Sequence, residues 1–135
     1  MFQFPHEFQL DAKDCGPTCV KIIAKYYGRF YSLPYLRDLC GISREGVSFL
    51  DISDACEKIG LRTKCVKIDF DTLRLIPLPC IIHWQDSHFV VVYKINSQYV
   101  WVSDPAKARI KYSIAGFQNG WLTNEKVGAV LAIEP

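Results

Sequence analysis

The sequence lacks the features that would place the protein in a membrane or on a nucleic acid. Its longest uninterrupted apolar runs have five residues, Phe89 to Tyr93 and Ala129 to Ile133, whereas a membrane-spanning helix needs about 20. The 16 Lys and Arg residues nearly balance the 14 Asp and Glu residues. This balance gives no electrostatic basis for binding nucleic acid or an anionic membrane surface. The N-terminus also lacks the basic stretch followed by an apolar stretch that marks a secretory signal, so export is not expected.

Metal-ligand patterns are missing as well. No Cys-x-x-Cys pair occurs, and His6, His83 and His88 have none of the spacings of a structural zinc site. We therefore expect neither a metal nor another cofactor, and we expect His6 to be solvated in an N-terminal extension. The cysteines are even in number, which is compatible with three disulfides. However, a chain of 135 residues without a signal can fold without cross-links, so reduced thiols are favoured. The six cysteines are Cys15, Cys19, Cys40, Cys56, Cys65 and Cys80.

The order of the expected elements predicts a single α+β domain over residues 1–135. Half of the residues are apolar, which excludes disorder and provides a core. Capping residues and 3.6-residue periodicity predict a helix after Asp14, a second over 32–40 and a third between Ser48 and Gly60. A helical turn is expected at 71–73. β-Rich runs predict strands over residues 61–68, 80–84, 88–95, 99–103, 110–112 and 127–133. A helical N-terminal half packed on a C-terminal antiparallel sheet follows from this order.

Cys15 occupies a position suited to a reactive thiol. A helix N-terminus carries a partial positive charge and unpaired N–H groups, which stabilise a thiolate. The thiolate is the nucleophilic form of cysteine, so Cys15 is a candidate nucleophile. Cys19 lies one helical turn further on and is expected to be a core residue.

A nucleophilic thiol needs a base, and His88 is favoured. A three-residue turn at 96–98 would pair Ile95 with Tyr99 and place Asp104 diagonally across from His88 on one face of the sheet. Asp104 could then orient the imidazole, as the third member of a nucleophile–base–orienter set. A shift of the register by one residue would separate the two side chains. His83 remains the alternative base, although it lies inside an apolar strand and has no acidic partner in a comparable position.

The oxyanion of a tetrahedral intermediate needs hydrogen-bond donors. The backbone N–H of Cys15 is one candidate, and the side-chain amide of Gln9 is a second. The alternative for Gln9 is an exposed glutamine in a loop.

These residues fall within a longer pattern that resembles the double-glycine leader peptidases, the papain-like domains at the N-terminus of peptidase-containing ABC exporters. Residues 9–19 read QLDAKDCGPTC and carry the core of the resemblance. Further matches appear in the family's order and span most of the chain, among them Tyr26-Tyr27-Gly28, Gly46-Val47-Ser48, Leu78-Pro79, His83-Trp84, His88-Phe89-Val90 and Ser103-Asp104-Pro105. The resemblance implies a papain-like fold with Cys15 as nucleophile, His88 as base and acid, Asp104 as orienting residue and Gln9 as oxyanion donor.

The resemblance also implies a substrate and partners. It implies cleavage after a Gly-Gly pair in the leader of a bacteriocin-type or pheromone precursor, with the leader bound as an amphipathic helix. Transmembrane and ATPase domains of the same exporter would follow in the full protein, and ATP would act only there, because no GxxxxGK[ST] motif occurs in these residues. The domain would then lie on the cytoplasmic side of the bacterial membrane. Two alternatives remain, a non-catalytic module that docks leaders and another papain-like acyl-transfer enzyme such as an amidase.

Overall fold

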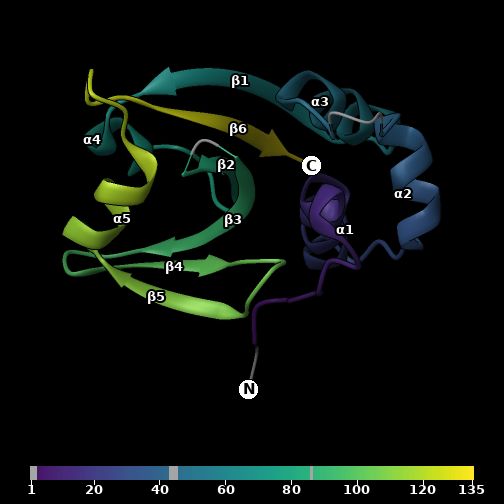
Figure 1. The fold of residues 1–135 in the computed structure, drawn as a ribbon, viewed down its shortest axis with the longest axis horizontal. Coiled ribbons are helices and arrows are strands. Elements are labelled where there is room, and N and C mark those ends of the chain that lie inside the picture. Colours follow the sequence, from purple (N-terminus) through teal and green to yellow (C-terminus); the bar gives the residue numbers. More distant parts are fainter. Residues whose placement is uncertain (1–2, 43–45, 86) are drawn as a thin grey trace.

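The computed structural model describes residues 3–42, 46–85 and 87–135 and contains helices followed by a sheet (Figure 1). The helical elements are the 3₁₀ helix η1 (Ala12–Asp14) and the α-helices α1 (Cys15–Tyr26), α2 (Leu33–Cys40), α3 (Phe49–Lys58), α4 (Phe70–Leu73) and α5 (Ile114–Trp121). The strands are β1 (Arg62–Ile68), β2 (Cys80–Trp84), β3 (His88–Ile95), β4 (Tyr99–Ser103), β5 (Arg109–Ser113) and β6 (Gly128–Glu134). None of the helices in the described ranges is long and apolar enough to cross a membrane.

The predicted α+β class is confirmed. The six strands form one antiparallel sheet in the order β1-β6-β2-β3-β4-β5. Helices α1 to α3 lie at one side of this curved sheet, and α4 and α5 lie at the other (Figure 1). The last strand, β6, inserts between β1 and β2 and is therefore not an edge strand.

Local signals explain where the first helices begin and end. The Ser32 hydroxyl accepts a hydrogen bond from the backbone N–H of Tyr35, and α2 ends at Gly41, whose φ of 64° suits glycine. At the start of α3, Ser48 and Asp51 form the expected reciprocal capping box. These contacts involve residues close in sequence, which is why the sequence pattern predicts the helices well.

The sheet separates two apolar cores because side chains alternate between its faces. One core joins the helices α1 to α3 to the sheet and includes Ile22, Ile23, Ile81, Val91 and Leu131. The other lies under α4 and α5 and includes Phe70, Ile82, Val90, Phe117 and Trp121. Cys19 belongs to the first core, as predicted, and its thiol donates to the carbonyl oxygen of Phe89 at 3.3 Å. This contact fixes the first turns of α1 against the start of β3.

Helix α5 is absent from the sequence prediction. Two glycines within its eight residues lower the helix propensity of the segment, which hides the helix from local pattern analysis. The reason for one of these glycines is tertiary. A Cβ atom at Gly120 would lie 2.4 Å from the ring of Trp84, so the helix can pack this closely only with glycine there.

Candidate active site

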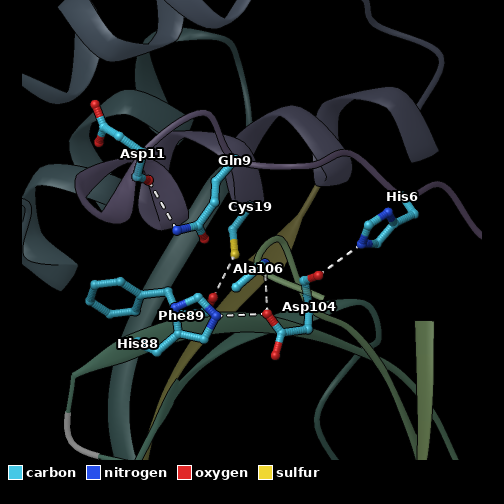
Figure 2. A network of polar contacts seen from close by, with 8 residues as sticks. All are labelled: His6, Gln9, Asp11, Cys19, His88, Phe89, Asp104 and Ala106. Carbon is cyan, nitrogen blue, oxygen red and sulfur yellow. Dashed lines mark hydrogen bonds and ion pairs between the residues drawn. The ribbon is translucent and has the colours of Figure 1, made fainter. Parts of the chain in front are cut away.

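The proposed base and its orienting residue meet at the ends of two neighbouring strands. Nε2 of His88, the first residue of β3, lies 2.7 Å from Oδ1 of Asp104, which directly follows β4 (Figure 2). A carboxylate oxygen can only accept, so Nε2 of His88 carries the hydrogen. This leaves the other ring nitrogen, Nδ1, for a second partner, and Cys15 is among the groups whose interactions raise the pKa of His88.

The electrostatic environment favours the charged forms of both residues. Burial by itself lowers the pKa of His88, but interactions with Asp104 and Cys15 outweigh this effect and raise it to about 9. For Asp104, burial raises the pKa, and the contacts with His88 and the backbone N–H of Ala106 outweigh this effect and hold the pKa below its usual value. An imidazolium at neutral pH can supply a proton to a leaving group.

A β-bulge brings Asp104 to the same face as His88. Near the turn, Ile95 pairs with Val100, so the predicted pairing of Ile95 with Tyr99 is wrong. Continued along the strands, that register would put Asp104 on the face opposite His88. The register shifts between Val92 and Lys94, so that Val91 pairs with Ser103. The extra residue in the bulge restores the predicted pairing of the strands beside His88 and Asp104. The predicted pairing next to the turn is not restored.

Cys15 is the first residue of α1 and is only 6% exposed. The preceding residue, Asp14, has the N-cap position, but its side chain does not cap the helix. Its carboxylate is fully buried, and its Oδ1 lies 2.9 Å from Nε of Arg37 on α2, an ion pair that lacks the geometry of a hydrogen bond. The sequence analysis missed this pair, and the only available signal was the charge of Asp14 next to an apolar helix.

The other five thiols are held in the neutral form. Burial raises the pKa of Cys40, Cys56 and Cys80 to about 12 and that of Cys19 well above its ordinary value. The pKa of Cys65 on β1 is also raised, because neighbouring atoms partly desolvate its thiol although the residue is exposed. All six cysteines are free, as the sequence analysis predicts.

Gln9 lies beside the candidate base. It lines a cleft of about 300 Å³ together with Trp84, Ser87, His88, Asp104 and Lys107. Its Nε2 donates one hydrogen to the carbonyl of Asp11 at 3.0 Å (Figure 2), which leaves the second amide hydrogen available. Its Oε1 is buried without a hydrogen-bond partner among the described residues. Gln9 is therefore a residue of the cleft and not an exposed loop glutamine.

The two other histidines differ in their surroundings. His83 lies on β2 opposite Phe89 and contacts the rings of Phe89 and Phe49, with centroids 5.1 and 6.1 Å away. The hydrogen bond of Asp104 is with His88, the base that the sequence favours. The expectation that His6 is solvated is wrong, because His6 is partly buried and its Nε2 lies 2.7 Å from the carbonyl oxygen of Asp104 (Figure 2). The sequence contains no local signal for this contact between residues 98 positions apart.

With this geometry in place, comparison with known proteins identifies the family. The model of the peptidase C39 family matches residues 3–127. The chain belongs to this family. It is a peptidase domain, and the family named by the resemblance in the sequence is confirmed.

This C39 peptidase domain resembles parts of longer processing and transport proteins. It is 37% identical over 120 residues to the lactococcin-G-processing and transport ATP-binding protein LagD of Lactococcus lactis, covering 84% of this chain and 17% of LagD. It is 33% identical over 104 residues to the colicin V secretion/processing ATP-binding protein CvaB of Escherichia coli, covering 77% of this chain and 15% of CvaB. The chain thus spans less than a fifth of the length of these two relatives.

Solved structures share the fold over nearly the whole chain. A double glycine motif protease from an AMS/PCAT transporter, crystallised with a leader peptide, superposes with a TM-score of 0.91 at 30% identity and covers 98% of this chain and 92% of that one. The peptidase domain of Streptococcus ComA, a bifunctional ABC transporter involved in quorum sensing, has a TM-score of 0.87 at 28% identity, with 98% and 99% coverage.

Proposed function

We propose that this C39 peptidase domain is a cysteine endopeptidase that removes leader peptides from exported precursors by cleaving after a Gly-Gly pair. The observation that carries the proposal is the 2.7 Å contact between Nε2 of His88 and Oδ1 of Asp104, which leaves Nδ1 of His88 for Cys15. The relatives named for processing bacteriocins and the neighbour named as a double glycine motif protease support the substrate class.

Each proposed catalytic residue has a defined step. The Cys15 thiolate attacks the carbonyl carbon of the second glycine, and the oxyanion receives hydrogen bonds from the Cys15 N–H and the Gln9 amide. The C–N bond then breaks, and the leader remains joined to Cys15 as a thioester. The His88 imidazolium gives its Nδ1 proton to the leaving amine of the cargo. Water, deprotonated by His88, attacks the thioester and releases the leader carboxylate and Cys15. Asp104 keeps the ring of His88 oriented throughout.

Selection of the Gly-Gly pair has a simple steric basis. A channel too narrow for side chains admits only residues that have none, so glycine is selected by exclusion of all other residues. The leader itself would bind as an amphipathic helix through spaced apolar anchors, which supply affinity at a distance from the scissile bond.

The proposed setting is a longer exporter. We propose that residues 1–135 form one peptidase domain next to the transmembrane and ATPase domains of an ABC transporter, on the cytoplasmic side of the bacterial membrane. The names of LagD and CvaB as ATP-binding transport proteins, and the small share of each that this chain covers, support this setting. ATP and export would belong to those other domains, and the peptidase chemistry itself uses no cofactor.

The direct test is digestion of a synthetic leader–cargo peptide by the purified chain under reducing conditions, followed by mass spectrometry. The expected products are a leader ending in Gly-Gly and a cargo with a new N-terminus. Cys15→Ala should abolish cleavage, whereas Cys65→Ala, which removes an exposed thiol on β1, should leave it unchanged. An intact peptide that still binds the wild-type chain would instead indicate a docking module, and cleavage without preference for Gly-Gly would indicate another acyl-transfer activity.

A further inference from the structure

The N-terminal segment, residues 4–9, is bound along the strand ends that carry Asp104. Phe4 is 6% exposed and stacks on Tyr93 of β3, with ring centroids 4.2 Å apart. The carbonyl of Pro5 accepts from the Ser103 hydroxyl at 3.1 Å, and the backbone N–H of Gln9 donates to the carbonyl of Pro105 at 2.9 Å. The segment passes the ends of β4 and β5 before α1 begins (Figure 1). It therefore contacts the residues on both sides of Asp104.

The backbone N–H, the carbonyl oxygen and Oδ1 of Asp104 all form hydrogen bonds. Its backbone N–H donates to Ala108 at 2.9 Å, and its Oδ1 accepts from His88 and from the N–H of Ala106. Its carbonyl oxygen accepts from the N–H of Lys107 at 3.0 Å and from Nε2 of His6 at 2.7 Å. Of these partners, His88 and His6 lie outside the turn formed by residues 104–108, and His6 is the more distant in sequence. Because a carbonyl oxygen cannot donate, Nε2 of His6 carries the hydrogen.

We propose that His6 is a positioning residue for the catalytic set: its ring holds the carbonyl of Asp104 so that the carboxylate faces Nε2 of His88. The inference rests on the proposed function of Asp104 as the orienting residue. His6 does not touch the reacting atoms and acts only through Asp104. Without the His6 hydrogen bond, the tight turn from Asp104 to Lys107 keeps its local contacts but loses its anchor to the N-terminal segment.

A loosened Asp104 has a specific electrostatic consequence. The groups that set the charge of His88 are Cys15 from α1 and Asp104 from the end of β4, with the charge of Lys107 acting on Asp104. A carboxylate held less firmly raises the pKa of His88 less, so the imidazolium is lost at a lower pH. The chemical step also needs the His88 ring to be held in its orientation by Asp104, whereas leader binding does not, so kcat should fall while KM stays unchanged.

The experiment compares His6→Ala, His6→Gln and Glu7→Gln with the wild-type chain. His6→Ala should lower kcat about tenfold, the factor expected from one lost hydrogen bond, and move the alkaline limb of the kcat profile to lower pH. His6→Gln can still present an amide N–H to the Asp104 carbonyl and should restore both quantities. Glu7→Gln breaks the ion pairs of Glu7 with Lys21 and Lys25, both at 3.0 Å, and loosens the same segment without touching His6. The Glu7→Gln variant should keep the wild-type kcat and the wild-type alkaline limb.

NMR titration of the His88 imidazole in the wild-type chain and in His6→Ala measures the same shift in pKa without any leader peptide. A failure of the double-glycine proposal therefore leaves this test intact. A wild-type kcat and alkaline limb in His6→Ala would overturn the inference, as would an impairment that His6→Gln fails to restore. If His6→Ala does not fold, His6→Phe takes its place, because it keeps the edge contact with Phe8 and lacks only the donor. An unshifted limb in His6→Phe would overturn the inference in the same way.

Discussion

Arg37 on α2 neutralises Asp14, the residue directly before the proposed nucleophile. The carboxylate of Asp14 is fully buried, and 2.9 Å separates its Oδ1 from Nε of Arg37. The pair joins the start of α1 to a second helix, and so it fixes where Cys15 lies relative to the rest of the helical half.

Arg37→Ala should destabilise the fold, because it leaves a buried carboxylate without its counter-ion. We expect a loss of about 1–3 kcal/mol in the free energy of unfolding, less than for a wholly buried pair since Arg37 is partly exposed. Urea denaturation at neutral pH measures this loss in the free energy of unfolding. Asp14→Asn removes the charge, and in that background the further change Arg37→Ala should cost much less. Equal costs in both backgrounds would show that the ion pair contributes nothing.

Activity should decline on the alkaline side as His88 loses its proton. The pKa of His88 is raised to about 9, chiefly by the contacts with Asp104 and Cys15 that outweigh its burial. The imidazolium that protonates the leaving amine therefore persists up to that pH, and kcat/KM should fall above it. Asp104→Asn removes one of the raising contacts and should move this limb to lower pH. A pH profile of peptide cleavage checks both expectations, and an unmoved limb in Asp104→Asn would contradict the assignment.

The raised pKa of His88 also makes the stability of the fold depend on pH. Because the pKa of His88 in the folded chain, about 9, lies above the value of about 6.5 for an unfolded histidine, protonation favours the folded state. The contribution is fully present below about pH 6.5 and is lost as the pH rises through about 9. The difference in unfolding free energy between the wild-type chain and His88→Gln should shrink over that window in chemical denaturation experiments. A difference that stays constant across it would contradict the raised pKa.

Gly120→Ala tests the close packing of α5 on the sheet. The new methyl group would lie 2.4 Å from the Trp84 ring, so the helix or the ring must shift. Overpacking of this kind costs about 1–3 kcal/mol. Gly116→Ala in the same helix meets only the Ser113 hydroxyl at 3.1 Å and serves as the matched control, with a much smaller effect. Thermal unfolding distinguishes the two variants, and equal midpoints would show that α5 is not tightly packed at Trp84.

The helices and strands were largely predictable from the sequence because their signals are local. Ser32, Ser48 and Asp51 cap helices through partners three residues away. The apolar runs of β2, β3 and β4 match the predicted strands residue for residue. Helix α5 was not predicted because its two glycines lower helix propensity, and one of them, Gly120, is required by the close approach of Trp84, a tertiary neighbour.

For the candidate site too, the sequence predicts some features and only the tertiary structure decides others. A cysteine at the start of a helix within a family motif is visible in the sequence, and so are a histidine that opens a strand and an aspartate that follows the next one. The side chains of His88 and Asp104 meet because of a bulge between Val92 and Lys94, and the contacts of His6 with Asp104 and of Asp14 with Arg37 likewise join segments far apart in the sequence. Strand register and contacts between distant segments are set by the packing of the whole chain, so no short pattern of residues encodes them.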